Sequence, residues 1–336
     1  MNGSARSRRP TSADVAREAG LSRATVGYVL NEVQHQSIPE PTRQRVLAAA
    51  AKLGYTPSAA ARSLRSGRSN LVLCLLPDWP VGPAVASLMS ELSTQLAEHG
   101  LTFVSHQRAA GGRPLSDVWK TINPMAVLVL DQIDPVDATA LTAAGLMVSV
   151  AVRDGPNDPQ LLGVTDERIG RIQVEHLAAG GRTRIGYAYP TDERLLTFAS
   201  PRLRGAQQAC AELGLEPPVV QTIELTLEST QRAVEAWQSA DLPIDGVCAY
   251  NDEIAIALLA ALRRNGQVVP DDIAVIGVDD IPLARVCDPP LTSVNADARA
   301  LAHYLTERVL QDLNGEKGRM PRAGSDLIRL TVRDST

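Results

Sequence analysis

From residue 71 onward, short apolar runs alternate with amphipathic stretches. The apolar runs are typical of buried parallel strands, and the stretches between them repeat apolar residues at helical spacing. Strands are predicted at 71–76, 101–105, 126–130 and 146–150, and then at 184–189, 219–223, 246–250 and 273–278. Helices are predicted at about 84–98, 166–179, 202–213, 228–239, 252–264 and 297–313. Two successive sets of this kind indicate two doubly wound α/β lobes, whose ligands bind beyond the carboxyl ends of the strands.

Before residue 57 the pattern predicts helices and no strands, with a flexible arm at 1–10 and a loop at 32–40 between the second and third helices. TSADVAREAGLSRATVGYVLN (11–31) predicts two short helices, with Thr11 or Ser12 capping the first, Gly20 in the turn and Ser22 capping the second. A third helix is predicted from about Pro41 to 53. A helix-turn-helix places its second helix in the DNA major groove. The positions of that helix outside its apolar face are Arg23, Ala24, Thr25, Gly27 and Tyr28.

Between the two patterns, Pro57 breaks the chain and an alanine-rich stretch ends at Gly67. An isolated helix of this length is marginal in water. The stretch therefore predicts a linker with a helical bias.

Charge divides the chain at the same place. Residues 1–69 hold 11 Lys and Arg against 4 Asp and Glu, a net charge of +7, so that the total of −5 leaves −12 for residues 70–336. A basic N-terminal part followed by an acidic remainder predicts that only the N-terminal part contacts DNA phosphates. A merely solvated basic tail is the alternative, but it does not explain why the charge coincides with a helix-turn-helix.

Composition narrows the class of protein further. Apolar content of 44 % supports packed cores in a chain of 336 residues. No apolar run approaches a membrane span, and the polar, basic N-terminus is unlike a secretory signal, so we expect a cytoplasmic protein. The four cysteines lie far apart, mostly in apolar runs, and are expected to be small core residues: Cys74, Cys210, Cys248 and Cys287.

The segments DVAREAGLSRATVGYVLN and PTRQRVLAAAAKLGYTPSAAARSLRSGRSN resemble the lactose-repressor family of bacterial transcription regulators. HLAAGGRTRIGY, NDEIAIALLAALRRNG and PDDIAVIGVDDIPLARVCDPPLTSV resemble that family's effector-binding core. The resemblance implies an all-α helix-turn-helix headpiece (1–56), a hinge helix and linker (57–69) and a two-lobed core like that of periplasmic binding proteins (70–336). The first lobe would comprise about 70–165 plus 297–318, and the second about 166–296 plus the C-terminal strand.

For DNA, the resemblance implies a homodimer on a near-palindromic operator. Arg23, Ala24 and Tyr28 match the positions that face base edges, although the family often has Arg at the position of Tyr28. Leu64 matches a leucine that wedges into the minor groove, with Ala61 on the same face. The remaining expected DNA contacts are Ser22, Thr25, Asn31 and Tyr55, and the first three have helix capping or a solvated position as the alternative.

For the effector, the resemblance implies a small polar molecule such as a sugar, bound between the lobes. Arg202, Asn251 and Asp279 match the family's ligand-binding positions, and Trp79 and Asp131 follow first-lobe strands that open onto the same cleft. Helix capping or loop packing is the alternative for the first three. The family's aromatic platform is missing, because Leu225 occupies that position.

Two rival classes of protein agree less well with the sequence. A solute-binding protein would share the lobes but needs a secretory signal and no DNA head. An enzyme is not favoured, since the chain has no GxxxxGK[ST], no GxGxxG after the first strand, no GxSxG and no HExxH. The sequence therefore predicts an effector-controlled repressor that needs no cofactor and no metal.

Overall fold

The computed structural model describes residues 10–30, 38–55, 69–108, 115–130, 133, 135–150, 161–239, 243–315 and 327–336. The chain forms two compact units, Met1–Ser69 and Asn70–Thr336. The predictions for Asn31, Ala61, Leu64 and Asp131 lie outside the described residues.

The N-terminal unit contains the three predicted helices, α1 (Ser12–Ala19), α2 (Arg23–Leu30) and α3 (Glu40–Leu53). Thr11 caps α1 in a reciprocal pair with Asp14, and Gly20 ends it in the left-handed conformation (φ 63°) that glycine adopts without strain. The helices bury a small shared core that includes Val15, Val26 and Val46. The predicted caps and turn are confirmed, because their signals are local.

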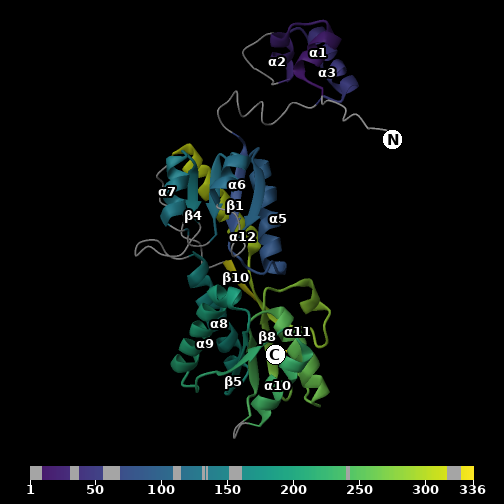
Figure 1. Cartoon of the computed structure of the whole chain (residues 1–336). Helices are drawn as coiled ribbons and strands as arrows, with labels where there is room; N and C mark the ends of the chain where they lie inside the picture. The colour runs from purple at the N-terminus through teal and green to yellow at the C-terminus, as the bar shows by residue number, and fades with distance from the viewer. Residues whose placement is uncertain are drawn as a thin grey trace, which may run out of the picture. The chain divides into compact units, whose positions relative to one another are not determined.

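The first lobe of the second unit is a parallel sheet in the order β2-β1-β3-β4. Its strands are β1 (Leu71–Leu76), β2 (Thr102–Gln107), β3 (Ala126–Val129) and β4 (Met147–Val150). Its helices are α5 (Pro83–Glu98), α6 (Leu115–Ile122) and α7 (Pro135–Ala143). The late helix α12 (Ala298–Asn314) packs against α5, so the chain returns to this lobe after building the other (Figure 1).

The second lobe has a six-stranded sheet in the order β10-β9-β8-β7-β5-β6, parallel except for the β9–β10 pair. Its strands are β5 (Ile185–Pro190), β6 (Val219–Ile223), β7 (Gly246–Ala249), β8 (Ala274–Val278), β9 (Thr292–Ala296) and β10 (Ile328–Thr331). Its helices are α8 (Leu161–Ala179), α9 (Leu196–Glu212), α10 (Leu227–Gln238) and α11 (Asp252–Arg264), with 3-10 turns at Glu193–Leu195 and Pro282–Arg285. Two doubly wound lobes are therefore confirmed.

Helices α8 and α9 lie side by side (Figure 1), and a glycine of each helix lies at their contact. A Cβ at Gly170 would overlap the carbonyl of Arg202, and one at Gly205 would overlap the carbonyl of Glu167. The absence of both side chains lets the two backbones approach closely. This contact sets the position of α9 and of the residues that it carries toward the cleft.

The start of α9 differs from its prediction. The sequence predicts a helix from residue 202, after Pro201, but α9 begins at Leu196 and contains that proline. The 3-10 turn Glu193–Leu195 leads directly into it. Arg202 consequently lies within a helix and not at its start. Among the described residues, no helix combines the length and apolar character needed to span a membrane.

Candidate DNA-binding surface and effector cleft

Helix α2 presents an exposed stripe opposite its buried face. Val26 and Val29 are buried in the three-helix core, whereas Arg23, Ala24 and Tyr28 are exposed. Residues four apart share a face of a helix, so Ala24 and Tyr28 lie together. The structure thus brings the three predicted base-reading residues onto one accessible surface.

The neighbouring polar residues of α2 have structural contacts of their own. The Thr25 amide donates to Ser22 Oγ (3.1 Å), and the two hydroxyls lie 2.9 Å apart. Ser22 therefore caps α2, which is the alternative considered from the sequence. Tyr55 is half-buried and packs against the helical core, and its amide donates to the Ala50 carbonyl at 2.8 Å. Its contacts are those of a packing residue.

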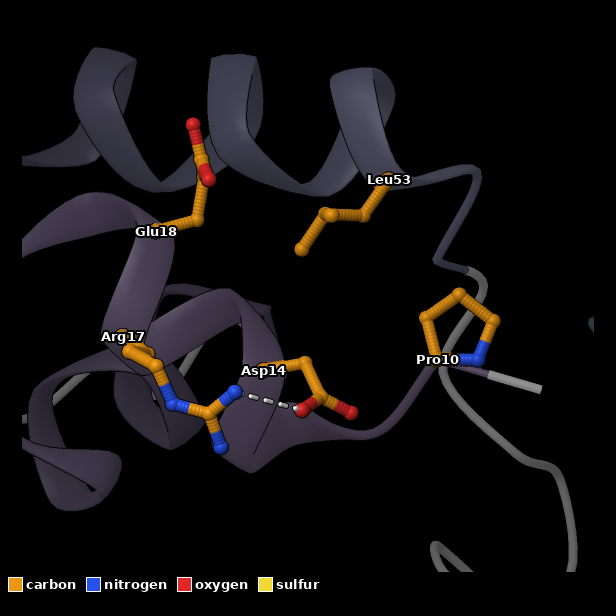
Figure 2. Close-up of a pocket in the computed structure, with 5 residues that line it drawn as sticks. All are labelled: Pro10, Asp14, Arg17, Glu18 and Leu53. Atoms are coloured by element: carbon orange, nitrogen blue, oxygen red, sulfur yellow. Dashed lines mark ion pairs between the residues drawn. The ribbon is translucent and has the colours of Figure 1, made fainter. Parts of the chain in front are cut away.

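A pocket on the same unit lies away from this stripe, between α1 and the end of α3. Figure 2 shows its lining, Pro10, Asp14, Arg17, Glu18 and Leu53. Its charged groups are paired: Asp14 binds Arg17 at 3.3 Å, and Glu18 binds Lys52 at 2.6 Å. None of the predicted DNA-contacting residues lines it. Of the two pairs, only Glu18–Lys52 joins α1 to α3.

In the second unit a cavity of about 450 Å³ opens between the lobes. Trp79, α5 and Leu130 line it from the first lobe, and Asp166, Arg202 and Asp279 from the second. Its volume is in the range of small-molecule sites. Three of the predicted effector residues, Trp79, Arg202 and Asp279, are therefore brought together.

The Arg202 guanidinium is buried and oriented from several sides. Its Nε donates to Asp166 at 2.8 Å, its Nη1 donates to the Tyr250 carbonyl at 2.9 Å, and its Cζ lies 5.0 Å from the Tyr250 ring centroid. Burial alone would lower the pKa of Arg202, but Asp166, Tyr250 and Asp279 outweigh it and the pKa is raised. The hydrogen bonds use two of its five N–H groups, so the charged, rigid group retains donors for a ligand.

Asp279 follows β8 in an unusual backbone conformation (φ 102°), and its amide donates to the Val294 carbonyl at 2.8 Å. Burial raises the pKa of its carboxyl, and the charge of Arg202 opposes that rise. The cavity thus contains a carboxylate acceptor and a guanidinium donor from different elements.

Asn251, the remaining second-lobe residue predicted to bind the effector, lies at the start of α11 and not in the cavity. Its Oδ1 accepts from the Ile254 amide (3.0 Å) and its Nδ2 donates to Glu253 (3.3 Å), so it caps α11. It does not line the cavity. Leu225 is 55 % exposed and also lies outside it.

The chain matches two family models. "Bacterial regulatory proteins, lacI family" covers residues 11–58, and "Periplasmic binding protein-like domain" covers 174–336. The transcriptional repressor PurR of Photobacterium profundum is 31 % identical over 96 % of this chain and 98 % of its own. The chain belongs to the lacI family of bacterial regulatory proteins.

Other relatives of this lacI-family regulator are similar over the same length. The transcriptional repressor CytR of Escherichia coli is 27 % identical over 97 % of this chain and 96 % of its own. A lac repressor dimer bound to operator and an anti-inducer shares the fold, with a TM-score of 0.78 at 22 % identity over 98 % of this chain and 99 % of that one. The protein is thus a DNA-binding transcriptional regulator and not an enzyme, as the sequence predicts.

Among the cavity residues that the sequence does not predict, Asp166 and Phe198 matter most for the chemistry of the site. Asp166 lies four residues before Gly170 on α8, and Phe198 lies on the part of α9 that was not predicted. The Phe198 ring meets Trp79 of the other lobe edge-on, with centroids 4.7 Å apart. An aromatic wall is therefore present without a ring at Leu225. The acid within an amphipathic helix was the one available signal for Asp166.

Proposed function

We propose that this regulator is a homodimeric repressor that acts in the cytoplasm and binds a near-palindromic operator. In this proposal a small polar effector, such as a sugar, binds between the core lobes and alters operator affinity. The observation that carries the proposal is the cavity that joins Trp79 of one lobe to Arg202 and Asp279 of the other.

The chemistry of the cavity supports a hydroxyl-rich ligand. Arg202 supplies donors, Asp279 supplies acceptors, and the rings of Trp79 and Phe198 supply an apolar wall. The structure of the regulator CelR with cellobiose offers an analogy: it is 25 % identical, covers 98 % of this chain and all of that chain, and has a TM-score of 0.64. A ligand that contacts both lobes can favour one angle between them, and it shifts the equilibrium only by its differential affinity for the two states.

The DNA side rests on the exposed stripe of α2 and on the charge of +7 over residues 1–69. One recognition helix reads only a few base pairs, so a two-fold dimer doubles the site. Asn31, Ala61 and Leu64 remain predicted DNA contacts, with Leu64 as a minor-groove wedge.

A selection of binding sites from random duplexes, followed by fluorescence anisotropy, tests the DNA role. Affinity should fall steeply with salt, because each neutralised phosphate releases counterions. Arg23→Ala should weaken binding to the selected site, whereas Arg232→Ala, which removes an exposed arginine of the core, should leave it unchanged. Equal effects of the two substitutions would contradict the assignment of DNA binding to α2.

A thermal-shift screen of mono- and disaccharides with the full chain tests the effector role. A ligand at 100 times its Kd stabilises a protein by about 2.7 kcal/mol, which such a screen detects. Each stabilising sugar is then added to the protein–operator complex. If none of the sugars, nor any other polar metabolite screened, stabilises the protein and changes operator affinity, effector control is refuted.

A further inference from the structure

The turn that carries Asp279 has a backbone that non-glycine residues rarely adopt. Asp279 has φ 102° and Asp280 has φ 47°, both in the region that favours glycine. Such conformations persist where surrounding contacts enforce them, and they concentrate at functional sites. The contacts that enforce this turn therefore bear on how the site is built.

The two amides after Asp279 are fixed by side chains from other elements. The Asp280 amide donates to Ser293 Oγ at 2.9 Å, and the Ile281 amide donates to Asp252 Oδ2 at 2.8 Å. The Ser293 hydroxyl in turn donates to Asp252 Oδ1 at 2.7 Å. One carboxylate on α11 thus holds the turn both directly and through a serine of β9.

Asp252 and Ser293 are themselves inaccessible. Both are fully buried, and neither lines the cavity. A Cβ at Gly277 would overlap the Asp252 carboxylate, so that glycine leaves room for it in the sheet. A buried carboxylate is expensive unless its oxygens are hydrogen-bonded, and here each oxygen accepts from the turn or from Ser293.

We propose that Asp252 and Ser293 are positioning residues of the effector site. They hold the turn Asp279–Ile281 in its strained conformation, so that the Asp279 carboxylate lines the cavity before any ligand binds. The free energy of ordering this carboxylate is then supplied by folding and not by the ligand, which favours tighter binding. The inference rests on the proposed function only in assigning Asp279 to the effector.

A double-mutant cycle in the full chain tests, without a ligand, whether Ser293 holds the turn Asp279–Ile281 in its strained conformation. Core unfolding in urea is followed by tryptophan fluorescence, since Trp79, Trp119 and Trp237 all lie in the second unit. Asp279→Gly should unfold at a higher urea midpoint than Asp279→Ala, because both variants lose the carboxylate near Arg202 and only glycine adopts the turn's backbone without strain. This difference is the gain from Asp279→Gly. In a Ser293→Ala background the turn can relax, and the gain from Asp279→Gly should fall to less than half.

Ser335→Ala is the matched control. Ser335 is equally buried, and its hydroxyl likewise joins two elements, donating to the Val275 carbonyl (2.6 Å) and accepting from the Thr292 amide (2.8 Å). In this background the gain from Asp279→Gly should equal that in the unmodified protein. If Ser293→Ala fails to fold, Ser293→Cys, which keeps the shape and weakens the hydrogen bonds, takes its place in the cycle.

Two results would overturn the inference: no gain from Asp279→Gly in the unmodified protein, or the same gain in the Ser293 and Ser335 backgrounds. Either would leave the proposed function standing, because the cycle uses neither DNA nor effector. Conversely, the cycle could show coupling between Asp279 and Ser293 in a protein whose operator binding responds to no small molecule. In that case the role in positioning an effector ligand would be excluded together with the effector.

Discussion

The buried pair between Arg202 and Asp166 predicts a large loss of stability when one partner is removed. The two side chains are 9 % and 7 % exposed and lie 2.8 Å apart. Arg202→Ala deprives Asp166 of this cation within the protein and also removes the bond to the Tyr250 carbonyl. Breaking a buried pair in this way typically costs about 3–5 kcal/mol, because the remaining charge stays buried. In a core of this size that corresponds to a drop in Tm of roughly 10 °C.

Urea unfolding of the full chain, followed by tryptophan fluorescence, measures this cost. Arg202→Leu and Asp166→Leu should each destabilise the core by several kcal/mol, whereas the double variant should cost far less than their sum, since neither charge of this pair then stays buried without the other. Additive costs, or a cost below about 1 kcal/mol for Arg202→Leu, would refute the reasoning. Arg202→Lys is the better variant for testing the effector, because it keeps the charge and loses the planar fork.

Three further predictions concern other parts of the chain. Burial raises the pKa of Asp252 to about 7 from its usual 3.8, against hydrogen bonds from Ser293 and Ile281. The stability due to this raised pKa is full below pH 3.8 and is lost as the pH rises through 7. The free energies of unfolding of the unmodified protein and of Asp252→Asn, measured in urea, should therefore diverge by up to roughly 4 kcal/mol across that window. Parallel pH profiles of the two proteins would contradict this. Thr11→Ala should destabilise the headpiece by about 1 kcal/mol through loss of the α1 cap, and an unchanged midpoint by circular dichroism would count against it. Leu64→Ala should weaken binding to the specific operator far more than to random DNA in an anisotropy titration, and equal losses would exclude the wedge.

Much of the fold follows from local patterns. The runs at 71–76 and 219–223 are strands with the predicted bounds, and helix α11 spans the predicted 252–264. The cap at Thr11 and the turn at Gly20 also form as expected. These features depend on side-chain period, capping oxygens and permissive backbone within a few residues, all of which the sequence displays directly.

The sequence by itself also determined the class of protein, through a basic helix-turn-helix ahead of two α/β lobes, and the candidacy of Arg202 and Asp279 at the cleft. Only the tertiary structure decided what those residues contact. Asp166 lies 36 residues before Arg202 and reaches it because Gly170 and Gly205 let α8 and α9 approach. Contacts of this kind depend on how distant segments pack, and no spacing along the chain encodes them.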